Sequence, residues 1–277
     1  MRGSKGPLAR VVVVENASGD GSAGRIRSWA NESAASCGAE PSDWLVLLEA
    51  TENRGYAAGN NIGLAWIDAH GAASHVWLLN PDTLVTPDAL LHLVSYMEAE
   101  PEIGACGALL CEMDQPDRIQ CYGGAGFRDW SARPFDLGKA ALVTDPIDQH
   151  DVERQLGYVM GACMLVSAAF LRAAGPMDER FFLYFEEIAW QRAAGPAYRP
   201  GFAPNARVYH RRHASGGRNE LYLFANRLRF ARWYQPWSVP LVVCGLLGTA
   251  AAAAKRGEWR RTRLILSPRF WRFALLG

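Results

Sequence analysis

The chain has 277 residues, of which 49% are hydrophobic and 21% are charged, and its formal net charge is +1. This length suits one large domain or two small ones, and the composition excludes a disordered chain, a collagen and a protein with many membrane spans. Residues 1–206 carry 15 basic and 26 acidic side chains, whereas residues 207–277 carry 14 basic and 2 acidic ones. Such an acidic body with a basic tail predicts that the tail meets an anionic surface, either a membrane or a nucleic acid.

The first hundred residues alternate between short apolar runs and helical patterns. The apolar runs predict strands of a parallel sheet at Val11–Val14, Trp44–Leu48 and His75–Leu79. Helices are predicted at Arg25–Ala35, at Gly59–Ala69 and from Thr86-Pro87-Asp88 to about Ala99. This alternation is typical of an α/β sheet, which binds ligands where polar turns follow the carboxyl ends of its strands.

The second half of the chain is less regular. We expect a strand at Tyr158–Val166 and helices at Ala168–Ala174 and Glu186–Ala194. No internal repeat or low-complexity linker divides the body. The predicted organisation is therefore one α/β domain over residues 1–235 and a separate tail over residues 236–277.

The tail combines an uncharged stretch with arginines. The 22 residues between Arg232 and Lys255 carry no charge, and arginines interleaved with aromatic residues follow them. About 20 apolar residues are needed to span a bilayer, so three placements stay open: at the interface, across the membrane or buried in the core. The mixture of aromatic residues and arginine favours the anionic headgroup region of a membrane over nucleic acid.

The cysteines and the N-terminus indicate a cytoplasmic protein. None of the six cysteines forms a Cys-x-x-Cys pair, and several lie in apolar runs, so we expect reduced thiols. The first seven residues are polar and resemble no signal peptide. Together with the tail, these features predict a peripheral protein on the inner face of the plasma membrane.

Three polar clusters each follow a predicted strand. They are the turn that begins at Glu15 and Asn16, the Gly- and Asn-rich loop over residues 53–63, and Asn80-Pro81-Asp82. Asp82 and the Asn80 amide oxygen are hard ligands that suit Mg²⁺ or Mn²⁺ against a diphosphate. Taken alone, the first and third clusters are better explained as ordinary turns. For the second cluster the density of Gly and Asn makes a plain helix entry the weaker explanation.

Two further clusters lie downstream. Glu186 and Glu187 follow an aromatic run, where burial can raise the pKa of a carboxyl group towards that of a general base. They can also be helix N-terminal acids that complement the dipole. His210 can complete a metal shell or can simply end a strand near the basic tail.

These clusters, in this order, resemble the family-2 inverting glycosyltransferases of the GT-A fold, and most closely their rhamnosyltransferase-like branch. The resemblance covers about residues 10–235. The motifs that carry it are the Glu15–Gly21 turn, the 53–63 loop, Asn80-Pro81-Asp82, residues 161–166, residues 177–187, residues 206–210 and Asn226-Arg227.

The resemblance implies a Rossmann-like mixed α/β sheet flanked by helices, followed by a membrane-associated helical tail. It implies that Glu187, beside Glu186, is the catalytic base and that Asp82 and His210 hold Mg²⁺ or Mn²⁺. It further implies that the nucleotide donor is bound by Glu15, Asn16, Asn53, Gly55, Asn60 and Asn80.

The implied reaction moves a sugar, rhamnose in this branch, from a dTDP- or UDP-sugar to a hydroxyl group. The acceptor would be a saccharide or a lipid-linked saccharide in cell-envelope polysaccharide synthesis. No nucleic acid partner is expected.

The chain departs from the family pattern in three places. The family has a strand and a helix before the strand at Val11–Val14, and only ten residues precede that strand here. Ala189 and Ala225 replace an acid and an arginine that the family often has. The missing βα unit would leave two internal strands without a partner, so the alternative is a non-catalytic, truncated remnant that keeps a membrane-binding tail.

Overall fold

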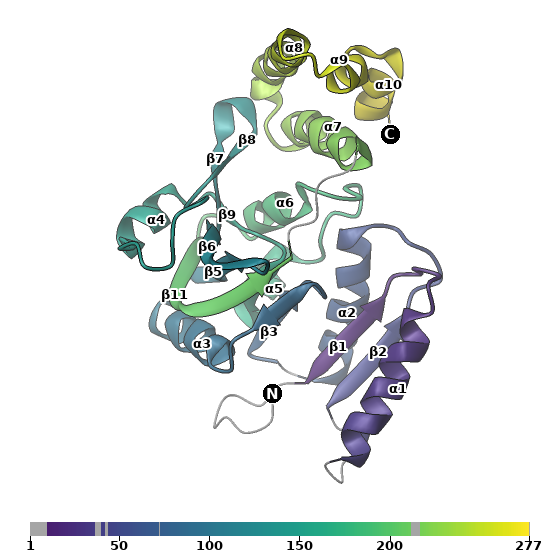
Figure 1. Ribbon diagram of the computed structural model, residues 1–277, viewed down its shortest axis with the longest axis vertical. Coiled ribbons are helices and arrows are strands. Elements are labelled where there is room, and N and C mark those ends of the chain that lie inside the picture. Colours follow the sequence, from purple (N-terminus) through teal and green to yellow (C-terminus); the bar gives the residue numbers. More distant parts are fainter. Residues whose placement is uncertain (1–9, 37–39, 42–43, 72, 212–216, 277) are drawn as a thin grey trace.

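The computed structural model describes residues 10–36, 40–41, 44–71, 73–211 and 217–276 (Figure 1). The first third alternates strands and helices: β1 (Val11–Glu15), α1 (Ser22–Ala35), β2 (Leu45–Glu49), α2 (Tyr56–His70), β3 (His75–Leu79), β4 (Thr83–Val85) and α3 (Ala89–Ala99). The three predicted strands form here, but His75–Leu79 does not join a parallel sheet with the other two. The predicted start of the third helix at Thr86 is wrong, because α3 begins at Ala89. The Thr86 hydroxyl instead donates to Arg207 O at 3.1 Å.

The middle of the chain holds most of the remaining strands. Its elements are β5 (Ile103–Glu112), β6 (Gln115–Tyr122), β7 (Gly124–Arg128), η2 (Asp129–Ser131), β8 (Arg133–Asp136), α4 (Gln149–Gln155), β9 (Tyr158–Val159), β10 (Cys163–Ser167), α5 (Ala168–Ala174), α6 (Glu186–Ala193) and β11 (Arg199–His210). The single strand expected at Tyr158–Val166 is wrong, because the chain turns at Gly161 and divides it into β9 and β10.

The central sheet is mixed and has the strand order β3-β10-β5-β11-β4, with β6 paired to β5. β5 and β11 run parallel, and the other pairings are antiparallel. Side chains of β5 alternate between two cores: Ala105 and Leu109 pack with α2 and α5, whereas Cys106 and Leu110 pack with α3. Helices therefore cover both faces of this sheet.

The sheet is interrupted between β1 and β3. β1 pairs in parallel with β2, β3 pairs with β10, and no ladder joins β1 to β3 among the described strands. Helix α2 packs against both parts: a Cβ at Gly63 would lie 3.3 Å from the Val14 side chain, and Leu64 belongs to the core that contains Val76. Within the described ranges, one edge of β1 and one edge of β3 therefore form no ladder.

The C-terminal helices are α7 (Gly217–Tyr234), α8 (Val239–Lys255), α9 (Trp259–Leu266) and α10 (Pro268–Leu276), with the short helix η3 (Pro236–Ser238) between α7 and α8. They share a core with α6, since Phe185 and Ile188 pack in the same cluster as Val242, Leu246 and Phe270. The arrowheads of β1, β2 and β3 point towards this group of helices (Figure 1). Loops at the carboxyl edge of the strands therefore lie between the sheet and the C-terminal helices.

Candidate active site

Asn16 and Asn53 hold the loop at the end of β1 against the loop that precedes α2. Asn16 Nδ2 donates to Gly55 O at 3.0 Å and to Asn53 Oδ1 at 3.3 Å, and Asn53 Oδ1 also accepts from Gly55 N at 3.0 Å. Glu15 ends β1, and its carboxylate accepts from Ser18 N at 2.7 Å. This hydrogen bonding lowers the pKa of Glu15, so the group is ionised at neutral pH. The structure thus brings four of the predicted donor-binding residues to one edge.

Gly55 is the point at which this edge meets the segment before Glu186. Its φ is +96°, and a Cβ there would lie 2.2 Å from Phe182 O. The next residue uses the same close approach, because Tyr56 N donates to Phe182 O at 3.0 Å. Only glycine can combine this backbone conformation with this contact. The hydrogen bond from Tyr56 N to Phe182 O satisfies the first backbone donor of α2, which begins at Tyr56, three residues before its predicted start.

Other polar residues of these clusters have structural contacts. Asn60 Nδ2 donates to Tyr56 O at 2.9 Å within α2. Asn61 fixes the 177–179 segment, because its Oδ1 accepts from Met177 N at 2.9 Å and its Nδ2 donates to Met177 O at 3.0 Å. Asn80 N donates to Ala162 O at 3.0 Å, and Asn80 O accepts from Thr83 Oγ1 at 2.7 Å. The donor-binding roles of Asn60 and Asn80 stay predictions.

Asp82 and His210 meet although 128 residues of sequence separate them. Asp82 Oδ1 lies 3.4 Å from His210 Nε2, because the antiparallel pairing of β4 with β11 brings their ends together. On the other side of the ring, His210 Nδ1 lies 3.0 Å from Gln120 Oε1. An amide oxygen only accepts, so Nδ1 donates to Gln120 and Nε2 faces the Asp82 carboxylate.

With a second proton on the ring, the two groups form an ion pair. A carboxylate and an imidazole are also ligands that divalent cations accept, so the pair fits a metal ion as two of its ligands. Within the described ranges, no three His, Cys, Asp or Glu side chains gather into a larger metal site. Any further ligands would have to come from the diphosphate or from water.

Glu186 and Glu187 are the first two residues of α6. Glu186 is 3% exposed, and an oxygen of each carboxyl group is buried without a hydrogen-bond partner among the described residues. Burial raises the pKa of Glu187 to about 7. Burial and the charge of Glu187 raise the pKa of Glu186 well above its usual value. Buried oxygens without partners and raised pKa values are typical of groups that exchange protons with a ligand.

The turn before these carboxyl groups has an unfavourable backbone. Tyr184 and Phe185 have φ of +70° and +77°, the left-handed region that side chains with a Cβ rarely adopt. Such a residue costs about 1–3 kcal/mol, so the surrounding contacts must hold it in place. Among them, the buried Asn226 amide donates to Leu183 O at 2.8 Å and to Tyr184 O at 3.1 Å.

Two tyrosines lie beside the carboxyl pair, Tyr56 on α2 and Tyr158 on β9. Burial and the negative charge of Glu187 raise both pKa values well above their usual value, so both hydroxyl groups stay protonated. Tyr56 Oη donates to Gly161 O at 2.6 Å, and Ala162 O accepts from the Asn80 backbone. These contacts join Tyr56, through the 161–162 turn, to the end of β3.

Three residues that shape this site had no role predicted from the sequence: Tyr56, Gln120 and Asn226. Tyr56 and Asn226 lie in the motifs that carry the resemblance, whereas Gln120 lies in no motif. Ala189 and Ala225, the departures from the family pattern, are 1% and 0% exposed. Neither place leaves room for a charged side chain.

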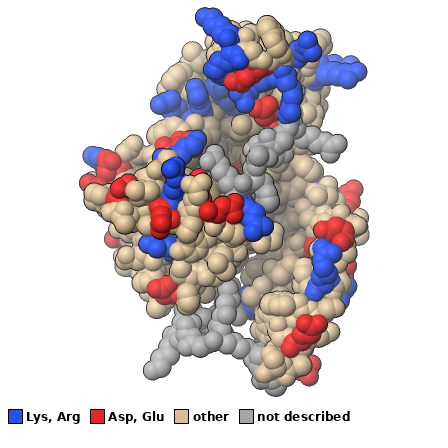
Figure 2. Space-filling view, viewed as in Figure 1, with Lys and Arg blue, Asp and Glu red and all other residues tan. Residues whose placement is uncertain are grey.

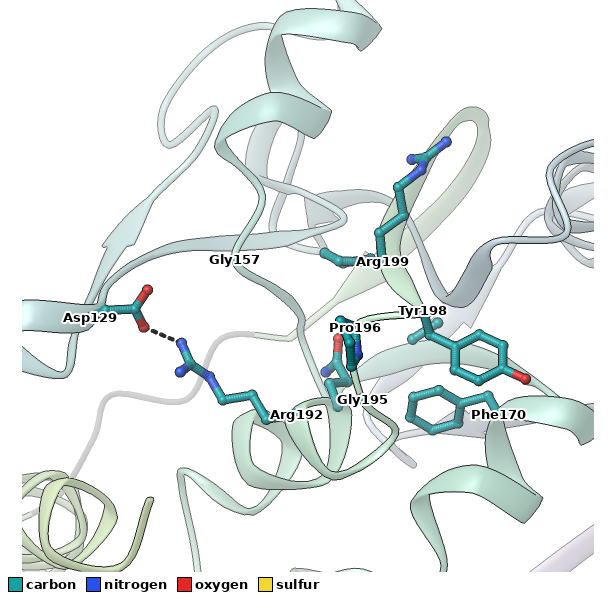
Figure 3. A pocket seen from close by; sticks show the side chains of 11 residues that line it. Asp129, Gly157, Phe170, Arg192, Gly195, Pro196, Tyr198 and Arg199 are labelled. Atoms are coloured by element: carbon teal, nitrogen blue, oxygen red, sulfur yellow. Dashed lines mark hydrogen bonds and ion pairs between the residues drawn. The ribbon is translucent and has the colours of Figure 1, made fainter. Parts of the chain in front are cut away.

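Two pockets flank the site. One, of about 420 Å³, lies at the carboxyl edge of β1 and β2 and is lined by residues that include Asn16, Glu52, Arg54, Asn61 and Glu179. The other, of about 360 Å³, lies beside α6 and is shown in Figure 3, where Arg192 pairs with Asp129 and Phe170 lies against Tyr198. None of the predicted site residues lines the second pocket.

The chain is similar to two curated glycosyltransferases. It is 26% identical over 247 residues to N-acetylglucosaminyl-diphospho-decaprenol L-rhamnosyltransferase from Mycobacterium tuberculosis, which covers 78% of both chains. It is 25% identical over 188 residues to the low-salt glycan biosynthesis hexosyltransferase Agl10 from Haloferax volcanii, which covers 65% of this chain and 52% of that one.

Solved glycosyltransferases have a similar fold. GalNAc-T7 with UDP, GalNAc and Mn²⁺ superposes with a TM-score of 0.56 at 13% identity, over 75% of this chain and 38% of that one. A mannosyltransferase from Pyrobaculum calidifontis, in complex with GDP-Man and Mn²⁺, superposes with a TM-score of 0.50 at 20% identity, over 96% and 73%. The mixed sheet between helices is the predicted GT-A fold.

The family model described as Glycosyl transferase family 2 matches residues 2–168. This match includes the loops with Glu15, Asn53 and Asp82, and the structure brings Glu187 and His210 from the rest of the chain to the same region. The chain belongs to glycosyl transferase family 2.

Proposed function

We propose that this protein transfers a sugar from a dTDP- or UDP-sugar to a hydroxyl group of a saccharide or lipid-linked acceptor, with inversion at the anomeric carbon. The observation that carries the proposal is the buried pair Glu186 and Glu187 at the start of α6, directly after the segment whose Phe182 O accepts from Tyr56 N. The rhamnosyltransferase similarity favours rhamnose as the sugar and cell-envelope polysaccharide as the product.

Glu187 is the proposed base. Its residue is partly exposed as a whole, whereas Glu186 is 3% exposed, so Glu187 is the member of the pair nearer to an approaching acceptor. With a pKa of about 7, it is partly ionised at neutral pH and still basic enough to take a proton. The proton passes from the acceptor hydroxyl to Glu187, the oxygen forms its bond to the anomeric carbon, and the nucleoside diphosphate leaves from the opposite face. Glu186 keeps its proton and limits the negative charge at the site.

The donor would occupy the edge held together by Asn16 and Asn53, with its base near Glu15. The pocket of about 420 Å³ beside Asn16 offers space there. Asp82 and His210 would hold a divalent cation, Mg²⁺ or Mn²⁺, which supplies charge for the departing diphosphate. Gln120 orients the ring of His210 so that Nε2 faces Asp82.

The C-terminal helices would attach the protein to the inner face of the plasma membrane. The segment Pro236–Lys255 is long and apolar enough to cross a bilayer. One stripe of α8, which includes Val242 and Leu246, packs on the body, while Leu241 and Leu247 on the opposite stripe are each 45% exposed. A helix that is apolar on both sides and packed on one of them suits a position in the plane of the interface.

Charge supports the same placement. Lys and Arg side chains gather over α8, α9 and α10 at the top of the molecule (Figure 2). The exposed basic residues there are Lys255, Arg256, Arg260, Arg263, Arg269 and Arg272. Trp237 and Trp259, exposed by 62% and 59%, supply aromatic anchors. An anionic leaflet would attract this face and bring lipid-linked acceptors to the site.

The test of the proposed reaction is a transfer assay with dTDP- and UDP-sugars, Mn²⁺ and a lipid-linked saccharide, read by mass spectrometry. Glu187→Gln and Asp82→Asn are expected to lower transfer by about 100-fold or more, as loss of a catalytic base or a metal ligand does. Glu153→Gln is the matched control, because Glu153 is a carboxylate of similar burial that pairs with Arg199 at 2.9 Å. Full transfer by either site variant would contradict the assignment.

A second candidate is a non-catalytic protein that keeps the membrane-binding helices. The observation that favours it is the interrupted sheet, in which β1 and β3 each leave one edge without a ladder among the described residues. This candidate predicts no change in thermal stability with dTDP- or UDP-sugars and Mn²⁺. A metal-dependent rise in the melting temperature, absent in Asp82→Asn, would instead support the enzyme.

Flotation with vesicles tests the membrane placement. Vesicles of phosphatidylcholine and phosphatidylglycerol are expected to carry the protein upwards, whereas pure phosphatidylcholine carries much less. The double variant Leu241→Asp, Leu247→Asp should lose binding. Leu91→Asp on α3 is the control, because Leu91 is also 45% exposed. Equal flotation of all variants would contradict the proposed face.

A further inference from the structure

A chain of buried contacts leads from the last helix to the turn that carries Glu186 and Glu187. Its centre is Asn226 on α7, which is 0% exposed. Asn226 Nδ2 donates to Leu183 O at 2.8 Å and to Tyr184 O at 3.1 Å. These two carbonyl groups belong to the turn in which Tyr184 and Phe185 have positive φ. The amide therefore holds the backbone in the conformation that starts α6 at Glu186.

Arg229 continues the chain to α10. Arg229 is 3% exposed, and its Nη1 donates to Asn226 Oδ1 at 3.1 Å while its Nη2 donates to Phe273 O. Its guanidinium also lies 4.2 Å from the centre of the Phe273 ring. No ion pair between described residues involves Arg229. Burial of a guanidinium without a carboxylate costs desolvation free energy. Its hydrogen bonds to the two oxygens, Asn226 Oδ1 and Phe273 O, offset part of that cost.

Aromatic contacts run beside these hydrogen bonds. Phe182, whose backbone oxygen accepts from Tyr56 N, stacks on Tyr222 of α7 at 5.0 Å. Tyr222 in turn contacts Phe273 of α10 at 5.7 Å. Helix α7 thus contacts the 182–185 segment through Asn226 and Tyr222, and Phe273 of α10 contacts α7 at Arg229 and Tyr222. A shift of Phe273 would therefore reach the turn both through hydrogen bonds and through ring contacts.

We infer that Asn226 is a positioning residue for Glu187 and that Arg229 links it to α10, so that the seating of the last helix sets the geometry of the catalytic turn. This inference rests on the proposed role of Glu187 as the base. If the C-terminal helices bind a membrane, the link would couple attachment to the readiness of the base. The groups that face Glu187 are Glu186 on its own helix, Tyr56 on α2 and Tyr158 on β9.

The first test is the pH dependence of kcat in Asn226→Ala. Once the turn is released, Glu187 reaches water, so the acid limb of the profile should move down by about half a unit or more. We expect kcat to fall about tenfold or more and KM for the donor to change little, because the donor loops do not contact Asn226. Leu228→Ala, a truncation of a core residue on the same helix, should lower thermal stability and leave the acid limb in place.

A rescue experiment separates positioning from packing. Tyr184→Gly supplies a residue that adopts positive φ without cost, so the turn should persist without the Asn226 amide. In that background, Asn226→Ala should cost much less in kcat than it does in the wild type. An equal cost in both backgrounds, or an acid limb that does not move in Asn226→Ala, would overturn the inference.

Arg229→Met tests the link to α10, because methionine keeps an unbranched chain but cannot donate to Asn226 Oδ1 or Phe273 O. It should move kcat and the acid limb in the same direction as Asn226→Ala. Wild-type behaviour would remove Arg229 from the inference. If the wild type transfers no sugar, the proposed function fails by itself. A ¹³C NMR titration of the Glu187 carboxyl group then decides the inference, and equal titration in wild type and Asn226→Ala overturns it.

Discussion

Replacement of Glu187 by glutamine should make the protein more stable while it removes the base. In the folded protein the pKa of Glu187 is about 7, compared with its usual value of 4.5. The folded state therefore keeps a proton that the unfolded state loses above pH 4.5. Stability falls as the pH rises from 4.5 to about 7, and the full penalty is present above that pH.

The size of the penalty follows from the shift. Each pKa unit corresponds to about 1.4 kcal/mol, so the buried carboxylate costs about 3 kcal/mol above pH 7. Glu187→Gln removes the charge and should recover most of this free energy at pH 8 and little of it at pH 4.5. Transfer should fall by about 100-fold or more, because the amide cannot take the acceptor's proton.

Urea denaturation of wild type and Glu187→Gln at pH 4.5, 6 and 8 measures the effect. The difference in unfolding free energy should grow with pH and level off above pH 7. Glu153→Gln, which weakens the contact with Arg199, should destabilise the protein and leave transfer per folded molecule unchanged. A pH-independent difference for Glu187→Gln would refute the reasoning that Glu187 is a buried group with a raised pKa.

Two further predictions follow from contacts at the site. Gly55→Ala should lower the unfolding free energy by about 2 kcal/mol or more, measured by urea denaturation, because its Cβ would lie 2.2 Å from Phe182 O at a φ of +96°; a neutral substitution would show that the loop rearranges freely. Gln120→Leu should raise the Mn²⁺ concentration needed for half-maximal transfer about 10-fold or more, because the His210 ring loses the acceptor that orients it. Unchanged metal dependence in Gln120→Leu would argue against His210 as a ligand.

The strands that the sequence predicted best are those with unbroken β-branched or apolar runs, such as Val11–Val14. The sequence did not predict β5, although nearly all of its residues are buried. Its glycines weaken the strand pattern, yet they allow close packing: a Cβ at Gly104 would lie 2.6 Å from Phe170, and one at Gly107 would lie 2.2 Å from Gly123 O. Local pattern cannot reveal a position that is required by a distant neighbour.

The candidate site was predictable in its residue types and less so in its contacts. Polar clusters after strands identified Asn16, Asn53 and Asp82, because strand ends share an edge of the sheet. The contact of Asp82 with His210 depends on the pairing of β4 with β11, which no local pattern contains. Gln120 and Asn226 act through hydrogen bonds to partners distant in sequence, so their roles are visible only in the folded chain.

The interruption between β1 and β3 has a consequence for how the molecule opens. No inter-strand hydrogen bonds join the β1–β2 pair to the central sheet in the part of the chain that the structure describes. It is held through α2 and the contacts around Gly55. A unit attached in this way can unfold locally without unfolding the rest. Amide protons of β1 and β2 should therefore exchange with solvent through an opening of lower free energy than those of β5. A nucleotide bound at this edge should slow the exchange of β1 and β2 at concentrations too low to change the global stability.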